Sequence, residues 1–206
     1  MYKFFLKRFF DIILSLVAII LLLPFFIPVF TILILTGEHK VFYFQKRIGY
    51  KNKPFNIWKL ATMLKDSVKL PGGYHTTHND PRILPFGVFL RKTKLNELPQ
   101  LINIFIGDMR FIGPRPLADK TFSPYPSHVK KNIYKVKPGL TGIGSIIFRD
   151  EERLLSETLM EPEEFYVTNI SPYKGELELW YQKNLNFLTD LKLLFCTAWV
   201  VFFIDS

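Results

Sequence analysis

Residues 12–35 read IILSLVAIILLLPFFIPVFTILIL, a run of 24 residues without a formal charge. At about 1.5 Å per residue, a straight helix of this length reaches about 36 Å, enough to cross a bilayer core of about 30 Å. Pro24 and Pro28 fall inside the run, and each removes a backbone hydrogen bond and favours a kink or a break. This stretch decides the fold class, because it predicts a membrane helix near the amino end of the chain.

The charges on both sides of this run are positive: Lys3, Lys7 and Arg8 precede it, and Lys40, Lys46 and Arg47 follow it. The positive-inside rule therefore gives neither end a reason to leave the cytoplasm. We expect residues 1–36 to form a re-entrant membrane helix with a helix-break-helix geometry. A single-spanning anchor is one alternative, because a proline can sit in a spanning helix. A cleaved signal peptide is disfavoured, because the run is too long and no A-x-A-like site follows it.

The length and composition of the chain exclude several protein classes. Its 206 residues are 49% hydrophobic and 22% charged, which predicts one compact domain with an appended element and excludes global disorder. A single cysteine, Cys196, excludes an internal disulfide and a multi-cysteine metal site. The net charge of +9 divides into +16 over residues 1–149 and −7 over residues 150–206. The basic part fits an anionic partner such as nucleic acid, phospholipid headgroups or a phosphorylated small molecule.

Residues 37–206 predict a small α/β domain that rests on the membrane surface. Two β-favouring runs, 41–46 and 55–60, flank a turn-like segment and predict a hairpin. Apolar residues from Leu95 to Phe105 follow helical spacing, and Gly107 ends that helix. The acidic portion 150–164 predicts solvated helix. The apolar stretch 185–204 is too short to span and is expected to pack or to lie on the membrane surface.

The start of the predicted helix at residues 95–105 carries the most informative polar residues. Asn96 is a preferred N-cap residue, and Pro99 then falls in the first turn, where its missing N–H costs nothing. This register places Glu97 at a positive helix end, with Arg91, Lys92 and Lys94 just upstream. A pyrophosphate or a hydrated divalent cation fits such a place. The alternative is an ordinary, well-capped surface helix.

Two further features bear on ligand binding. Arg115 lies between Pro114 and Pro116, which fix the backbone around a guanidinium suited to clamping a phosphate. Its alternative is a structural ion pair with a carboxylate such as Asp108. His75 and His78 lie three residues apart in a polar loop, and without a third ligand of the right spacing we expect them to be solvated rather than metal-bound.

Several stretches of the sequence resemble the bacterial sugar transferases, small monotopic phosphoglycosyl transferases that start glycan assembly on a polyprenyl carrier. These stretches are Lys7–Asp11, Phe44–Gly49, Asp80–Arg82, Leu90–Thr93, Glu97–Asn103, Gly107–Met109, Gly113–Pro116 and Lys137–Gly142. The resemblance covers nearly the whole chain, and the combination is specific. It implies an α/β fold with a re-entrant membrane helix, membrane-surface amphipathic helices and a small cytoplasmic domain. It also implies a monotopic place at the inner (cytoplasmic) membrane of a bacterium, facing the cytoplasm.

The resemblance implies transfer of a sugar-1-phosphate from a UDP-sugar to polyprenyl (undecaprenyl) phosphate, with release of UMP. This is the initiating step of capsule, O-antigen, exopolysaccharide or glycoprotein glycan assembly. In the family, an Asp-Glu dyad acts with Mg²⁺, and the Asp attacks the β-phosphorus to give a covalent phosphosugar intermediate. Here the dyad position reads Asn96-Glu97, and Glu97 is also the implied metal ligand. The implied phosphate-binding residues are Arg91, Arg115, Arg82 and Lys92.

Two departures from the family pattern bear on this function. A neutral amide at residue 96 is a far poorer nucleophile than a carboxylate. The family's Gln-containing segment after the Thr-Gly loop is replaced by residues 143–149, IGSIIFR. Asn96 is compatible with a working enzyme in which Glu97 or the acceptor phosphate is the nucleophile, with an engineered block of catalysis, or with a protein that binds substrate without turnover.

Three functions therefore compete. The first is a membrane-bound transferase, whose partners are the UDP-sugar, the polyprenyl phosphate and membrane phospholipid. The second, motivated by Asn96, is a non-catalytic membrane protein on the same scaffold that binds the substrates or a partner. The third, a membrane-tethered nucleic-acid binder, is disfavoured because no groove-reading or base-stacking motif is present. The oligomeric state stays open, with a homodimer as one alternative.

Overall fold

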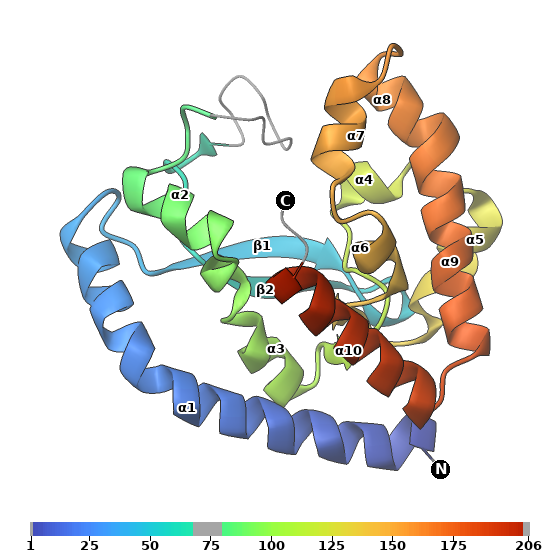
Figure 1. Ribbon diagram of the computed structural model, residues 1–206, viewed down its shortest axis with the longest axis horizontal. Helices are drawn as coiled ribbons and strands as arrows, with labels where there is room; N and C mark the ends of the chain where they lie inside the picture. Colours follow the sequence, from blue (N-terminus) through green and yellow to red (C-terminus); the bar gives the residue numbers. More distant parts are fainter. Residues whose placement is uncertain (1, 68–79, 204–206) are drawn as a thin grey trace. The chain divides into compact units, whose positions relative to one another are not determined.

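The computed structural model describes residues 2–67 and 80–203, so His75 and His78 lie outside the described residues (Figure 1). The helices are α1 (Lys7–Leu35), α2 (Pro85–Lys92), α3 (Gln100–Ile106), α4 (Asp119–Phe122), α5 (Ser127–Asn132), α6 (Ile143–Ile147), α7 (Glu151–Glu157), α8 (Pro162–Phe165), α9 (Ser171–Lys183) and α10 (Phe187–Phe203). The strands are β1 (Phe42–Ile48), β2 (Pro54–Leu60), β3 (Arg110–Ile112) and β4 (Gly139–Thr141). This mixture confirms the α/β class.

The amino-terminal helix corrects one expectation. The chain stays helical through both Pro24 and Pro28, so the expected helix-break-helix is one helix, α1. Figure 1 shows it as an unbroken ribbon that changes direction along its length. A missing proline N–H removes single hydrogen bonds and bends a helix, while the neighbouring bonds keep the helical conformation. Among the described residues, α1 is the helix long and apolar enough to cross a membrane, by length and composition.

The remaining predicted elements are largely confirmed. β1 and β2 form a two-stranded sheet, as the hairpin prediction required. The acidic portion forms two short helices, α7 and α8, and the apolar stretch near the carboxyl end forms α10. α10 keeps large apolar side chains such as Leu188, Phe195 and Trp199 more than half exposed.

The chain divides into two compact units, each built from separate stretches. Unit 1 comprises Met1–Ile13, Lys46–Phe55 and Ile104–Ser206, and unit 2 comprises Leu14–Gln45 and Asn56–Asn103. The division therefore cuts α1, the hairpin and α3, which pass from one unit to the other. The predicted boundary after residue 36 separates a membrane helix from a domain on the membrane surface, and it stays a prediction.

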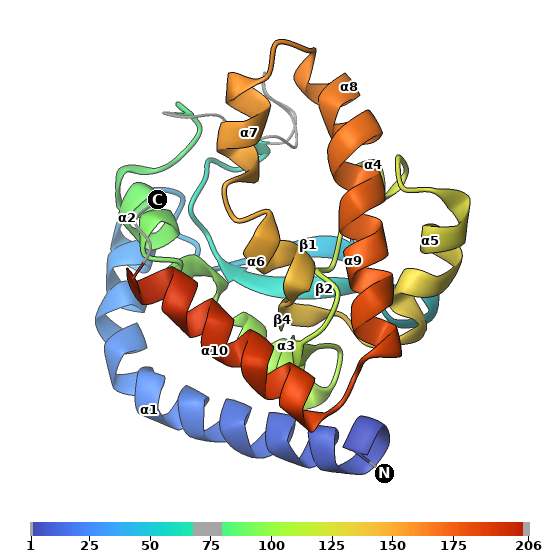
Figure 2. The same ribbon diagram turned by 45° about the vertical axis from the view of Figure 1, so that its right-hand side comes forward.

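Unit 1 is organised around the parallel pair β3–β4, in which Arg110 lies opposite Gly139 and Ile112 opposite Thr141. Figure 2 shows α6 between α9 and α10, and α6 contacts both helices. A core of six buried residues packs beside them: Leu117, Phe122, Tyr125, Val129, Ile133 and Tyr134.

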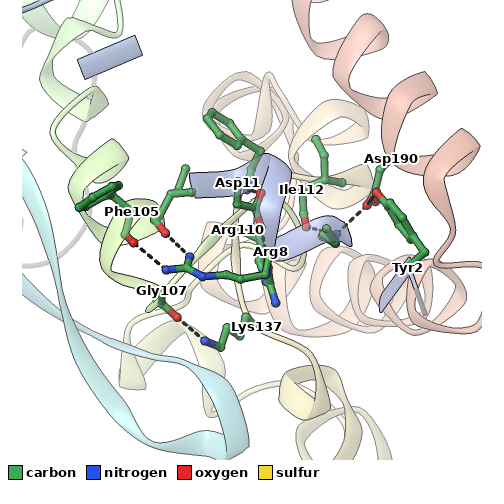
Figure 3. Close-up of polar contacts among 12 residues, drawn as sticks. Tyr2, Arg8, Asp11, Phe105, Gly107, Arg110, Ile112, Lys137 and Asp190 are labelled. Atoms are coloured by element: carbon green, nitrogen blue, oxygen red, sulfur yellow. Dashed lines mark hydrogen bonds and ion pairs between the residues drawn. The ribbon is translucent and has the colours of Figure 1, made fainter. Parts of the chain in front are cut away.

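Polar contacts fasten the first turns of α1 within unit 1 (Figure 3). The buried Lys7 ammonium pairs with Asp190 at 2.8 Å, and it donates to the carbonyl of Ile112 and the hydroxyl of Tyr181. One turn later, Asp11 pairs with Arg110 at 2.8 Å. The start of the apolar helix is therefore held to β3 and α10.

Arg8 adds a second attachment beside this one. Its guanidinium donates to the carbonyl oxygens of Ile104 and Phe105, each at 2.6 Å, at the end of α3. These carbonyls belong to the last turn of a helix, where four carbonyls lack an intrahelical partner, and a cation is favoured there.

Unit 2 has an apolar core formed by α1, β2 and α2. Leu33, Leu60 and Leu90 are its buried members. Phe42 of β1 lies edge-to-face with Phe30 and with Trp58, at centroid distances of 5.4 Å in both pairs. This core fixes α2, and the residues after α2 lead directly into the turn that holds Asn96 and Glu97.

The tightest packing point of unit 2 is Gly87 in α2. A Cβ at this position would lie 2.3 Å from the carbonyl oxygen of Thr62, which also accepts the N–H of Leu84 at 2.9 Å. Glycine at this site therefore allows the helix to touch the backbone after β2.

We predict that Gly87→Ala lowers the free energy of unfolding by about 1–3 kcal/mol, because the added methyl group overpacks the contact. At an exposed helix position the same substitution raises the free energy of unfolding by about 1 kcal/mol. A decrease would therefore indicate the close contact at Gly87. Unfolding of the detergent-solubilised chain measures it. Val88→Ala, at a residue that is 53% exposed, is the matched control and should change stability by less than about 0.5 kcal/mol. A Gly87→Ala protein as stable as the parent would contradict the contact.

Candidate functional site

The turn between α2 and α3 carries the two predicted catalytic residues. Lys94 adopts a left-handed conformation with φ 58°, and a 3₁₀ turn follows over Leu95–Glu97. The expected N-cap role of Asn96 is therefore wrong, because the residue before the helical turn is Lys94 and Asn96 lies inside the turn. The N-cap position of the helical turn thus lies two residues earlier than the sequence pattern indicated. Pro99 lies immediately before α3, where its missing N–H costs no helical hydrogen bond.

The side chain of Asn96 is buried, and its Oδ1 accepts no hydrogen bond from the described residues. An orphaned buried oxygen of this kind costs free energy of about 1–3 kcal/mol. Such groups occur where a ligand supplies the missing partner or where function requires the residue. Asn96 therefore does not act as a helix cap, and its role as a catalytic residue stays a prediction.

Glu97 forms an ion pair with Lys59 of β2, with Nζ and Oε1 3.0 Å apart and both side chains mostly buried. Lys59 is a neighbour of the predicted site that the sequence reasoning missed. Its signal was a single cation inside the apolar strand run 55–60, at a position where a lysine is unusual. The pair places a positive charge beside the predicted catalytic carboxylate.

Asn103 holds this arrangement together. It is fully buried, its Oδ1 accepts the backbone N–H of Trp58 at 2.9 Å, and its Nδ2 donates to the carbonyl of Asn56 at 2.8 Å. α3 is thereby fixed to β2 in one register. That register sets Lys59 of the strand against Glu97 of the turn.

The predicted phosphate-binding residues of unit 2 differ in their surroundings. Arg91 and Lys92 lie in the last turn of α2, one half-buried and the other exposed. Arg82 is buried and engaged by Asp80, with Nε 2.8 Å from Oδ1 and Nη2 2.5 Å from Oδ2, and its Nη1 donates to the carbonyl of Ser67. Its guanidinium thus shapes the loop 80–82, and its role toward phosphate stays a prediction.

Arg115 lies in unit 1, in the loop after β3. The hydroxyl of Tyr134 donates to the carbonyl of Arg115 at 2.8 Å and accepts the N–H of Leu117 at 3.0 Å. Gly139 donates its N–H to the carbonyl of Pro114 at 2.9 Å. These backbone contacts add to the restraint expected from the two prolines, and the phosphate-binding role of Arg115 stays a prediction.

The predicted magnesium site can be tested against the donor groups present. Within residues 2–67 and 80–203, no group of three or more His, Cys, Asp or Glu side chains converges as a metal cage would require. Mg²⁺ does not need one, because it commonly binds through one or two carboxylates, water and substrate phosphates. Glu97 supplies a carboxylate, and Asn96 beside it supplies a buried oxygen without a hydrogen-bond donor. The residues fit a substrate-assisted magnesium site.

Comparisons with known proteins agree with this chemistry. The sequence model of the family described as bacterial sugar transferase matches residues 2–204. The UDP-glucose:undecaprenyl-phosphate glucose-1-phosphate transferase of Klebsiella pneumoniae is 34% identical over 93% of this chain and 39% of that protein. The exopolysaccharide production protein ExoY of Sinorhizobium fredii is 30% identical over 93% of this chain and 83% of that protein. The undecaprenyl-phosphate galactose phosphotransferase of Salmonella typhimurium is 31% identical over 96% of this chain and 40% of that protein.

The chain thus spans about two fifths of the length of the Klebsiella and Salmonella proteins and most of the length of ExoY. The match nevertheless extends through both units, from the first turns of α1 to the end of α10. The chain belongs to the bacterial sugar transferase family.

Proposed function

We propose that the protein transfers a sugar-1-phosphate from a UDP-sugar to polyprenyl phosphate and releases UMP, as the first step of glycan assembly. The family match over residues 2–204 carries this proposal, because relatives sharing that region are named for sugar-phosphate transfer to undecaprenyl phosphate. The same names favour a transferase over a non-catalytic binding protein. In the reaction, a bond forms to the β-phosphorus of the donor, and the bond from that phosphorus to the bridging oxygen of UMP breaks.

The proposed site residues have different roles according to the chemistry of their side chains. Arg91, Arg115, Arg82 and Lys92 are the proposed phosphate-binding residues, since guanidinium and ammonium groups offset the charge of a diphosphate and a carrier phosphate. Glu97, held by Lys59, keeps a carboxylate at the reacting group.

The nucleophile of this chain differs from the family's aspartate. The amide of Asn96 carries no charge, and Oε1 of Glu97 is engaged by the Lys59 ammonium at 3.0 Å, which hinders attack by this carboxylate. We therefore propose that the phosphate of the carrier attacks the donor directly, with both substrates bound together.

Asn96→Asp provides the decisive comparison. The parent protein should release UMP from UDP-sugars only when polyprenyl phosphate is present, with sequential kinetics and no adduct. Asn96→Asp should release UMP before the carrier binds, follow ping-pong kinetics, and carry a phosphosugar on residue 96 visible by intact-protein mass spectrometry.

Glu97→Gln is the control, since full activity in it would remove Glu97 from the chemistry. A phosphosugar adduct on Glu97 of the parent would contradict direct attack. If only Asn96→Asp released UMP, the parent would be the non-catalytic binding protein instead.

We propose Mg²⁺ as the cofactor, held by Glu97 with Asn96 and substrate phosphates. When bound, it offsets the negative charge of the donor diphosphate. UMP release or UDP-sugar binding should fall on EDTA treatment and return with added Mg²⁺, and Glu97→Gln should raise the Mg²⁺ concentration needed for half-maximal binding. Donor binding that is indifferent to EDTA would contradict this assignment.

We also propose that α1 is re-entrant in the inner membrane of a bacterium, with both ends in the cytoplasm and α10 on the membrane surface. The basic flanks and the two prolines support this topology, and the exposed apolar side chains of α10 suit contact with phospholipid.

Cysteines introduced at Lys3 and at Lys40, each in a Cys196→Ser background, should resist a membrane-impermeant maleimide in cells whose inner membrane is intact. Both should react after that membrane is permeabilised. Labelling of either position in intact cells would contradict the re-entrant topology. Pro24→Ala should straighten α1 and increase labelling of one end.

A further inference from the structure

Glu178 is a deeply buried carboxyl group that the proposed chemistry leaves unused. It lies on the inner face of α9, with 2% of the residue exposed. Neither of its oxygens forms a hydrogen bond of standard geometry with the described residues. Burial raises the pKa of Glu178 to about 8, although Lys174 and the backbone N–H groups of Arg115 and Gly144 act to lower it. The carboxyl is therefore largely protonated at neutral pH.

Two loops of unit 1 meet at this carboxyl. One is the loop that carries Arg115, and the other leads from β4 into α6 through Gly142 and Gly144. A Cβ at Gly144 would lie 2.5 Å from Oε1 of Glu178, and a Cβ at Gly142 would lie 2.2 Å from the carbonyl oxygen of Gly113. The glycines thus explain how both loops approach α9 and each other so closely.

Other charged and titratable side chains near Glu178 are Lys174, Tyr134 and Tyr181. Lys174, one turn earlier on α9, pairs with Glu151 at 2.5 Å. Tyr134 lies toward the Arg115 loop and Tyr181 follows on α9; burial is the main reason that the pKa of each phenol is raised, so both stay protonated in the neutral range.

A buried carboxyl without a full set of hydrogen bonds costs stability. A hydrophobic residue at position 178 would avoid that cost but would offer nothing to the two backbone N–H groups. A functional role would therefore explain why a carboxyl group is kept between the two loops.

We propose that Glu178 is the positioning residue for Arg115: its carboxyl lies against the Gly142–Gly144 loop, which packs on Gly113 at the start of the Arg115 loop, and it holds both loops to α9. This fixes the loop so that the guanidinium meets a donor phosphate in one orientation. The inference rests on the proposed function, because it takes Arg115 as a phosphate ligand. Ionisation of Glu178 above neutral pH adds a negative charge beside the loops, and this charge opposes the binding of an anionic donor.

The test uses the full chain in detergent or nanodiscs, with UMP release measured against UDP-sugar concentration. At pH 7, Glu178→Ala should lower kcat/KM for the donor at least about tenfold, mainly through KM, because the loop loses its partner. Glu178→Gln should stay within about threefold of the parent, because an amide replaces a neutral carboxyl. Between pH 7 and 9, kcat/KM of the parent should fall with a transition near the pKa of about 8, and Glu178→Gln should lack that transition.

Hydrogen exchange gives a readout that does not depend on turnover. Glu178→Ala should speed exchange in the peptides that contain Arg115 and Gly144, and Glu178→Gln should not. Glu176→Gln is the matched control, because Glu176 lies on the same helix with 59% of its side chain exposed and pairs with His128. It should change neither exchange nor kcat/KM.

Unchanged exchange and unchanged kcat/KM in a folded Glu178→Ala would overturn the proposal. So would a transition near pH 8 that persists in Glu178→Gln. If Glu178→Ala does not fold, the pH comparison of parent and Glu178→Gln decides. If the parent releases no UMP at all, the proposed function fails, and the exchange data decide separately whether Glu178 holds the loop.

Discussion

The ion pair between Lys7 and Asp190 is the interaction on which the attachment of the amino-terminal helix depends. Taking two charges out of water is costly, and the attraction between them offsets that cost only when further hydrogen bonds satisfy both groups. Here Lys7 also donates to the carbonyl of Ile112 and to Tyr181, and Asp190 also accepts from Tyr2 and Tyr181. Breaking the pair from either side would leave an uncompensated buried charge.

This attachment links the long apolar helix α1 to the loop of unit 1 that carries Arg115, a predicted phosphate ligand. Ile112, whose carbonyl accepts from Lys7, is the last residue of β3, and the Arg115 loop follows directly. Arg110, at the start of the same short strand, pairs with Asp11. β3, a strand of three residues, therefore contacts α1 and leads directly into the loop of Arg115, a predicted phosphate ligand.

The turn of residues 94–97 carries Asn96 at the position where the family has an aspartate. The left-handed Lys94 and the fully buried Asn103 would hold an aspartate at position 96 in the same place as the asparagine, because both fix the backbone and neither touches the residue-96 side chain through a hydrogen bond that the structure records. Under the proposed function, the same backbone would therefore hold either residue, and the side chain at position 96 and the Lys59 cation beside Glu97 would set the chemistry.

The sequence by itself determined the features that depend on local pattern. The apolar run of α1, the β-favouring runs of the hairpin strands and the proline-flanked Arg115 each carry their signal within a few residues, and the combined motifs identified the family. The break expected at Pro24 and the N-cap expected at Asn96 were wrong, because bending of a helix and the left-handed Lys94 depend on backbone geometry that residue type only biases. Only the tertiary structure brought Lys59 to Glu97, Arg110 to Asp11 and Glu178 to the loop at Gly144. Each of these pairs joins residues tens of positions apart, and a contact made by chain folding at that separation leaves no periodicity or spacing in a single sequence.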